Sequence, residues 1–292
     1  MHRHLLYNGE IRSTSEPLVS PGQTGYMNGW GIFSTLRVLD GVLFAYERHY
    51  ARMKRDAPRV QVPFEITEEA LKLQLAKLIQ ANDVKNATLR VAVVRNHGGT
   101  FEGTGITRDT DIVVFTADLT VWGESVKLYS VPNGRHAASP FAGTKVLSWL
   151  QNLTWYEEAH QRGFDEVVLL NEHGHVSECT SANIFAILGN RVMTPPLETS
   201  GCLPGVTRAL LLEEIRTPGL TIAEQELTPA DLENAEQVFI TSTTRDLLPV
   251  ASIDGQPLKQ APEKLSALRR SFSEYQHTYV TSRQPQPETA KA

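Results

Sequence analysis

The sequence has little cysteine, no run of basic residues and no long apolar stretch. Its two cysteines, Cys179 and Cys202, are too few for a disulfide framework, so a reducing, cytoplasmic location is expected. The formal net charge is −5 and lysine and arginine do not cluster, so no nucleic-acid partner is expected. No segment has the pattern of a secretory signal or a membrane span, so no membrane partner is expected either.

Several common catalytic signatures are also missing. The nine histidines do not have the spacing of metal ligands, so no metal site is expected. The glycine-rich stretch 96–105 lacks the Gly-Lys-Ser/Thr sequence and the helix start of a phosphate-binding loop, and we interpret it as a mobile loop over a site. No nucleophile-elbow motif occurs. Any chemistry must therefore come from other residues.

Length and pattern indicate two α+β halves. The chain has 292 residues, of which 41% are hydrophobic, enough for a substantial core. Strand and helix patterns are mixed without strict βαβ alternation. The pattern breaks at 119–125, which we interpret as a linker between a smaller N-terminal domain, residues 1–118, and a larger C-terminal domain, residues 126–280. The polar tail, residues 281–292, is expected to be disordered.

Apolar periodicity and capping residues place the main elements. A helix over 45–57 is expected to bury one face, and Thr67 is expected to cap a second helix with a stripe of leucines. Further helices are expected over 147–161, 206–215 and 262–279, with another opening at Thr228 and Pro229. Strands are expected over 32–38, 88–94, 111–117, 126–131, 166–170, 184–187 and 237–241.

Lys145 and Glu178 are the strongest candidates for chemistry. Most lysines are solvated, but Lys145 follows a Gly-Thr pair and precedes Val-Leu, surroundings that favour the lowered pKa that imine chemistry needs. Glu178 lies between strands that are expected to be buried, where a carboxylate requires a partner. A protonated pyridine nitrogen would be such a partner. The alternative is a turn carboxylate bonded to backbone amides.

Two hydroxyl-rich turns are candidates for binding a phosphate. The sequence Gly205-Val206-Thr207 opens the helix expected over 206–215, and a helix N-terminus offers free N–H groups to an anion. Ser242-Thr243-Thr244 is a second turn of this kind, and Arg52 could supply a bidentate charge. An amine, a carboxylate and a phosphate cradle, in this order along the chain, predict pyridoxal 5'-phosphate (PLP) as the cofactor.

On these motifs the chain resembles the class IV (fold-type IV) PLP-dependent aminotransferases, from about residue 5 to residue 257. That family includes branched-chain and D-amino acid aminotransferases, (R)-selective amine transaminases and 4-amino-4-deoxychorismate lyase. The resemblance implies that Lys145 forms the Schiff base, that Glu178 binds the ring nitrogen and that Leu203 packs on the ring. Phosphate would be held by Arg52, Val206, Thr207 and Thr243. It also implies a cofactor between two domains and a homodimer that completes each site.

The substrate positions implied by the resemblance fit no single branch of the family. They are Asn28, Thr35, Arg37, Thr88 and Arg90. Asn28, Thr35 and Thr88 stand where branched-chain enzymes usually carry tyrosine, glycine and tyrosine. Arg90 or Arg37 would bind a substrate carboxylate, and Thr35 would shape the side-chain pocket. Ser148 and Trp149 stand where the family has asparagine and a tyrosine that bonds the cofactor.

Transamination between an amino acid or amine and a 2-keto acid, by a ping-pong mechanism through Lys145, is the leading hypothesis. The segment 33–38 instead looks like that of aminodeoxychorismate lyase, in which a threonine at the position of Thr35 assists elimination. Release of pyruvate and 4-aminobenzoate is therefore the alternative. A non-catalytic PLP carrier is a third hypothesis, which Arg90, Arg37 and Thr35 disfavour because they offer polar groups to a substrate.

Overall fold

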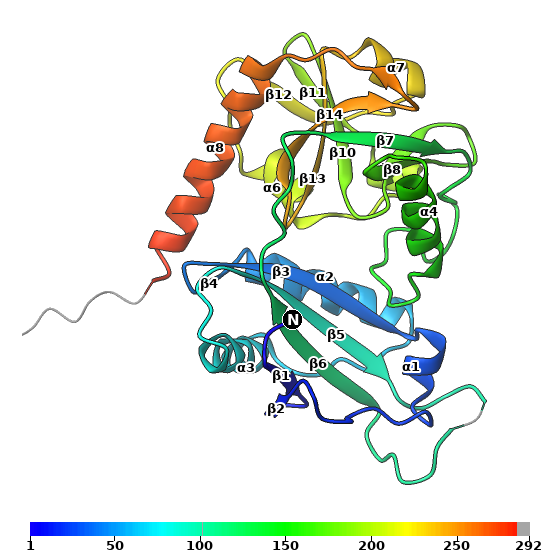
Figure 1. Ribbon diagram of the computed structural model, residues 1–292, viewed down its shortest axis with the longest axis vertical. Coiled ribbons are helices and arrows are strands. Elements are labelled where there is room, and N and C mark those ends of the chain that lie inside the picture. Colours follow the sequence, from blue (N-terminus) through cyan, green and yellow to red (C-terminus); the bar gives the residue numbers. More distant parts are fainter. Residues whose placement is uncertain (101, 285–292) are drawn as a thin grey trace, which may run out of the picture.

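The structure, a computed structural model, describes residues 1–100 and 102–284 of the chain. Figure 1 shows an N-terminal part below and a C-terminal part above, joined by an extended passage. This passage is the segment 118–125, which contains neither helix nor strand and includes the linker predicted at 119–125. The division into two domains stays a prediction. The last helix continues through Thr281, and the rest of the predicted tail beyond residue 284 lies outside the described residues.

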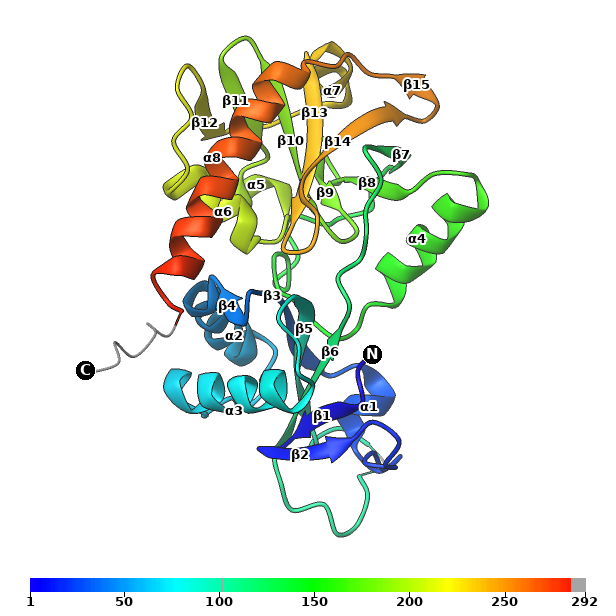
Figure 2. The same ribbon diagram turned by 60° about the vertical axis from the view of Figure 1, so that its left-hand side comes forward.

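The N-terminal part is an antiparallel sheet covered on one face by two helices. Within the described residues, the sheet has six strands in the order β2-β1-β6-β5-β3-β4. They are β1 (His4–Tyr7), β2 (Glu10–Ser13), β3 (Gly31–Leu39), β4 (Val42–Phe44), β5 (Ala87–Arg95) and β6 (Thr110–Ala117). The short α1 (Thr24–Asn28) precedes β3, while α2 (Tyr46–Arg59) and α3 (Glu68–Ala81) pack on the sheet (Figure 2).

The apolar faces of α2 and α3 explain this packing. Leu71, Leu75 and Leu78 of α3 are fully buried, as the predicted stripe requires, and they share one core with Met53 of α2. Burying each leucine side chain contributes roughly 1.5–3 kcal/mol. The side chain of Thr67 accepts a hydrogen bond from a backbone N–H of the first turn of α3 at 3.2 Å, which confirms the predicted cap.

The C-terminal part is a larger mixed sheet. Within the described residues its order is β12-β11-β10-β13-β14-β7-β8-β9, and β15 pairs with β14. The strands are β7 (Val126–Val131), β8 (Glu166–Leu170), β9 (Val176–Cys179), β10 (Asn183–Leu188), β11 (Arg191–Thr194), β12 (Thr221–Glu224), β13 (Gln237–Ser242), β14 (Asp246–Ile253) and β15 (Gln256–Pro257). The helices are α4 (Leu150–Gln161), α5 (Leu197–Ser200), α6 (Val206–Glu213), α7 (Pro229–Asn234) and α8 (Pro262–Thr281).

One predicted helix boundary is wrong in a way that matters for the site. The helix expected from residue 147 begins at Leu150. Val146 forms a β-bridge with Ile32 of β3, and the N–H of Leu147 donates to the carbonyl of Gly31 at 2.9 Å. This pairing holds the backbone after Lys145 extended along β3, so that the lysine is anchored to the N-terminal sheet.

Other predicted boundaries differ by a few residues, and six strands were not predicted. The first long helix ends at Arg59, the helix from Val206 ends at Glu213, and the final helix continues to Thr281. The additional strands are β2, β4, β9, β12, β14 and β15. Glu178 therefore lies within β9 rather than between two strands.

Helix α8 connects the C-terminal part to the N-terminal part (Figure 2). The ring of Phe44, in β4, packs edge-on against Phe272, Tyr275 and Tyr279 of α8, with centroids 6.2, 6.3 and 5.1 Å away. Such aromatic pairs contribute about 0.5–1.5 kcal/mol each beyond their buried area. The two sheets are thus held together at one side of the space between them.

Candidate active site

A cavity of about 450 Å³ lies between the two parts of the chain. Residues of β3, β5 and α2 form one wall, and loops of the C-terminal part form the other. It brings together most of the predicted site residues, namely Thr35, Arg52, Arg90, Lys145, Glu178, Leu203, Val206, Thr207 and Thr243. Residues that lie far apart along the chain thus face one enclosed space.

Three predicted substrate residues are not among those that line the cavity. Asn28 donates its side-chain amide to the carbonyl of Thr24 at 2.9 Å, within α1. Arg37 and Thr88 face each other across β3 and β5, two residues after Thr35 on β3 and two residues before Arg90 on β5. Arg37 is already paired, because its Nη1 donates to both carboxylate oxygens of Asp246 at 2.7 and 2.8 Å. Arg37 therefore lies outside the cavity lining, and its role in substrate binding stays a prediction.

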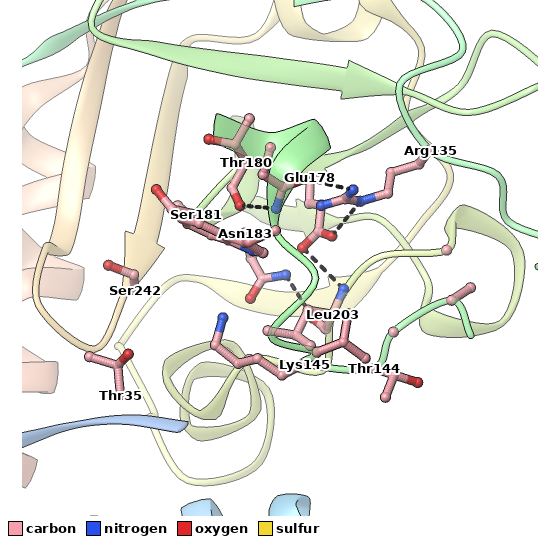
Figure 3. Close-up of a pocket in the computed structure, with 18 of the residues that line it drawn as sticks. Thr35, Arg135, Thr144, Lys145, Glu178, Thr180, Ser181, Asn183, Leu203 and Ser242 are labelled. Atoms are coloured by element: carbon pink, nitrogen blue, oxygen red, sulfur yellow. Dashed lines mark hydrogen bonds and ion pairs between the residues drawn. The ribbon is translucent and has the colours of Figure 1, made fainter. Parts of the chain in front are cut away.

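Lys145 extends into the space between Thr35, Asn183 and Ser242 (Figure 3). Its Nζ lies 4.4 Å from the centroid of the Phe33 ring and 6.0 Å from that of Trp149. Burial, followed by the positive charge of Arg52, lowers the pKa of Lys145 from 10.5 to about 7. An amine that is largely neutral at physiological pH is a nucleophile and a proton acceptor.

Helix α2 fixes the loop that carries the lysine. Asp56 is buried, and its Oδ2 accepts the backbone N–H of Lys145 at 3.0 Å while its Oδ1 pairs with Arg55. Arg55 also donates to the carbonyl of Gly143 at 2.9 Å, and Arg59 donates to two further loop carbonyls at 3.0 Å each. A buried face was predicted for this helix, but its contact with the lysine loop was not.

Glu178 is held at the cavity wall by two donors (Figure 3). Its Oε1 accepts from Nε of Arg135 at 2.9 Å, and its Oε2 accepts from the backbone N–H of Leu203 at 3.0 Å. Arg135 is oriented in turn by Asn152, whose Oδ1 accepts from Nη1 at 3.0 Å. The sequence analysis missed Arg135 because it comes from a loop with no motif of its own.

Arg52 and the start of α6 line the cavity at the predicted phosphate-binding end. Arg52 donates to the hydroxyl of Ser34 at 3.0 Å, and its buried Nε has no partner among the described residues. Burial lowers the pKa of Arg52 to about 10, which leaves it a cation at neutral pH. A Cβ at Gly205 would lie 2.0 Å from Oδ1 of Asn183, so any larger residue at the start of α6 would have to displace that side chain. Free N–H groups and a buried guanidinium favour an anion.

Arg90 is the candidate for a substrate carboxylate. Its guanidinium lies 3.8 Å from the centroid of the Phe33 ring, and burial lowers its pKa. It forms no ion pair with any residue in the described part of the chain. Ser148 and Trp149 also line the cavity, and Trp149 packs edge-on against Phe33 with centroids 6.0 Å apart.

The glycine-rich loop 96–105 is not part of this site. None of its described residues, 96–100 and 102–105, lines the cavity. The loop connects β5 to β6 at the end of the N-terminal sheet that lies away from the C-terminal part (Figure 1). The prediction of a loop over the site is therefore wrong within this chain, because β5 runs away from the cavity before the loop begins.

Within residues 1–100 and 102–284, no helix has both the length and the apolar composition to cross a membrane. No group of three or more histidine, cysteine, aspartate or glutamate side chains there is arranged to hold a metal ion.

The cavity thus combines a buried lysine, a carboxylate and a candidate anion site. Comparison with known proteins identifies the family to which the chain belongs. Residues 31–253 match the model of the family described as amino-transferase class IV, and the chain belongs to this family. It is 30% identical to D-alanine aminotransferase of Bacillus licheniformis over 258 residues, 87% of this chain and 89% of that protein. It is 27% identical to a putative branched-chain-amino-acid aminotransferase of Methanocaldococcus jannaschii over 272 residues, 91% and 94% of the two chains.

Solved structures agree on the fold. The branched-chain aminotransferase of Escherichia coli superposes with a TM-score of 0.83 at 22% identity, covering 94% of this chain and 95% of that one. A putative 4-amino-4-deoxychorismate lyase of Legionella pneumophila gives 0.81 at 24% identity, covering 89% and 96%. At such identities the likeness concerns the fold, and it confirms the predicted α+β, fold-type IV class. The family match and the two relatives confirm the predicted class IV aminotransferase and do not favour the lyase alternative.

Proposed function

We propose that Lys145 is the catalytic residue of a PLP-dependent aminotransferase, which moves an amino group between an amino acid or amine and a 2-keto acid by a ping-pong mechanism. The observation that carries the proposal is a buried amine whose pKa is about 7, in the same cavity as Glu178 and a buried arginine. The family match supports this activity.

The residues of the cavity fit PLP at its ring nitrogen, its ring face and its phosphate. Glu178 would meet the ring nitrogen, and Leu203 would lie on the ring face. The phosphate would be held by Arg52, Val206, Thr207 and Thr243, all of which line the cavity. The unpartnered Nε of Arg52 and the N-terminus of α6, which begins after Gly205, both suit an anion at this end. When bound, the cofactor supplies an aldehyde and an electron-accepting ring.

Lys145 would then move the proton on which the reaction depends. Its Nζ, as a neutral amine, takes the proton from the substrate Cα and holds it as an ammonium until it is returned. The rings of Phe33 and Trp149, beside Nζ, limit the positions of the amine and exclude water. Asp56 keeps the lysine backbone in place during these transfers.

Arg90 and Thr35 are proposed to select the substrate. They face each other on β5 and β3 and line the same wall of the cavity. Arg90 has no carboxylate partner among the described residues, so a substrate carboxylate would be its counter-ion. Thr35 would shape the adjoining pocket for the side chain.

The test is a half-reaction with single amino donors. Cofactor-loaded protein is mixed with branched L-amino acids, L-glutamate, D-alanine or an (R)-arylalkylamine, without a keto acid. We expect at least one donor to convert the lysine-bound cofactor to pyridoxamine phosphate. The conversion is monitored by the change in absorbance. Lys145→Ala should abolish it, whereas Lys127→Ala, at an exposed position of β7, should not. Full turnover by Lys145→Ala would disprove the proposal, and conversion of aminodeoxychorismate to pyruvate without transamination would favour the lyase.

We also propose a homodimer. Large apolar side chains are exposed at α4, where Leu150 is 78% and Leu153 52% exposed, close to the cavity-lining Trp149. A second copy covering this face would remove them from water. Replacing both leucines by aspartate should give a monomer in sedimentation analysis. Leu73→Asp, at a 66% exposed position of α3, is the matched control and should leave the assembly unchanged.

A cytoplasmic location is proposed as well. Both cysteines, Cys179 and Cys202, are free and buried, which suits a reducing compartment. Cell fractionation, with detection of the protein in the cytoplasmic fraction, tests this proposal.

A further inference from the structure

A buried ion pair lies at the cavity wall, where Arg245 lines the cavity and its partner Glu166 does not, and the reaction proposed above does not use it. Arg245, in the turn between β13 and β14, has a side chain that is 5% exposed, and Glu166, at the start of β8, is 1% exposed. Nη2 of the arginine lies 3.2 Å from Oε2 of the glutamate. Because both charges lose their hydration, such a pair adds little net stability compared with apolar residues. A contribution to the geometry of the site is therefore the better explanation for its place beside the cavity.

Arg245 also contacts the turn 242–244 and the residue that holds it. Its Nη1 reaches the hydroxyl of Ser242 at 3.5 Å, and its guanidinium lies 3.9 Å from the centroid of the Trp122 ring. Trp122 belongs to the passage between the two sheets and donates its Nε1–H to the carbonyl of Thr244 at 2.9 Å. The turn that contains Thr243 is thus held by contacts with Arg245 and Trp122, whose side chains pack against each other.

The same ion pair also holds the turn that follows Glu178. Nη1 of Arg245 donates to the carbonyl of Ser181 at 3.3 Å. Glu166 accepts hydrogen bonds from the hydroxyls of Thr180 and Ser181 and from a backbone N–H of β8. Two cavity-lining turns, one adjoining Glu178 and one containing Thr243, are therefore joined through a single guanidinium.

We propose that Arg245 is a positioning residue for the cofactor. It fixes the turn 242–244 relative to the turn 180–181, and so sets the place of Thr243 at the phosphate end with respect to Glu178 at the ring-nitrogen end. The inference rests on the proposed PLP site. Without the guanidinium, Ser242 and Trp122 lose their common support, while Lys145 keeps its anchors on α2 and β3. Phosphate binding should weaken more than binding of the ring.

The test variant removes both charges together. Arg245→Met alone would leave Glu166 buried without its cation, which is strongly destabilising. The double variant Glu166→Gln/Arg245→Met avoids this. Its amide oxygen can accept from the hydroxyl of Thr180, and its amide NH2 can donate to the hydroxyl of Ser181. Arg108→Met is the matched control, because it takes the cation from another buried carboxylate, Asp111, which does not line the cavity.

Two ligands distinguish an effect on phosphate binding from an effect on binding of the ring. The apoproteins are titrated with PLP and with pyridoxal, which lacks the phosphate, and thermal midpoints are measured in parallel. The double variant should bind PLP about tenfold more weakly, equivalent to ~1.4 kcal/mol, with an unchanged affinity for pyridoxal. Arg108→Met should lower the thermal midpoint and leave both affinities unchanged.

The outcomes are distinct. Wild-type affinity for PLP in the double variant, or an equal loss for both ligands, would overturn the positioning role. If the double variant does not fold, Trp122→Phe replaces it; this change keeps a ring against Arg245 but removes the donor to Thr244, and it should give a smaller loss for PLP alone. Failure of the wild-type protein to bind PLP at all would instead overturn the proposed function.

Discussion

The pKa of Lys145 can be tested through the rate at which the apoprotein binds PLP covalently. Only the neutral amine attacks an aldehyde, so this rate follows the neutral fraction of Lys145. After burial and Arg52, the charges that act on its pKa are Glu178, which raises it, and Arg90 and Arg135, which lower it. Arg90→Met should therefore raise the pKa, and Glu178→Gln should lower it further.

The size of the effect follows from the ionisation equilibrium. With a pKa of about 7, roughly half of the Lys145 amines are neutral at pH 7, whereas an ordinary lysine with a pKa of 10.5 has a neutral fraction on the order of a thousandfold smaller. Stopped-flow absorbance between pH 5.5 and about pH 9 should show the rate rising tenfold per pH unit and levelling above about pH 7.

The two variants should shift the pKa of Lys145 in opposite directions. A general disturbance of the cavity would not be expected to produce opposite shifts. The level part of the curve should begin at higher pH for Arg90→Met and at lower pH for Glu178→Gln. A rate that still rises about tenfold per pH unit up to about pH 9 in the wild-type protein would refute the lowered pKa. Shifts of the same sign in both variants would show that general disruption of the cavity, rather than charge, controls the amine.

Three further substitutions test the start of α6, the contact that holds the lysine loop and the substrate pocket. Gly205→Ala places a Cβ against Asn183, and the overpacking should cost about 1–3 kcal/mol in denaturant unfolding while weakening PLP binding. Asp56→Ala leaves the N–H of Lys145 without its charged acceptor, and a loss of about 1.5–3 kcal/mol is expected; unchanged stability would mean that the loop is held without it. Thr35→Gly should mainly change donor preference in the half-reaction, whereas loss of nearly all activity would revive the lyase alternative.

The candidate chemistry was readable from the sequence because it depends on local context. An amine between small and apolar neighbours, a carboxylate in an apolar stretch and a Gly-Val-Thr helix start each show in a few consecutive residues. Lys145, Glu178 and Thr207 were found in this way, and they line one cavity. The leucine stripe of α3 has the same origin, since a helical period of 3.6 residues fixes which side chains share a face.

Contacts between distant segments required the tertiary structure. The bond from Asp56 to Lys145 joins positions 89 residues apart, and that from Arg135 to Glu178 joins positions 43 apart. Periodicity within an element does not encode which other element it meets. For the same reason Arg37, on the same strand as Thr35, was expected at the substrate but is paired with Asp246. The amino-acid sequence thus determined the reactive groups and the elements, and long-range packing decided which of them share the cavity.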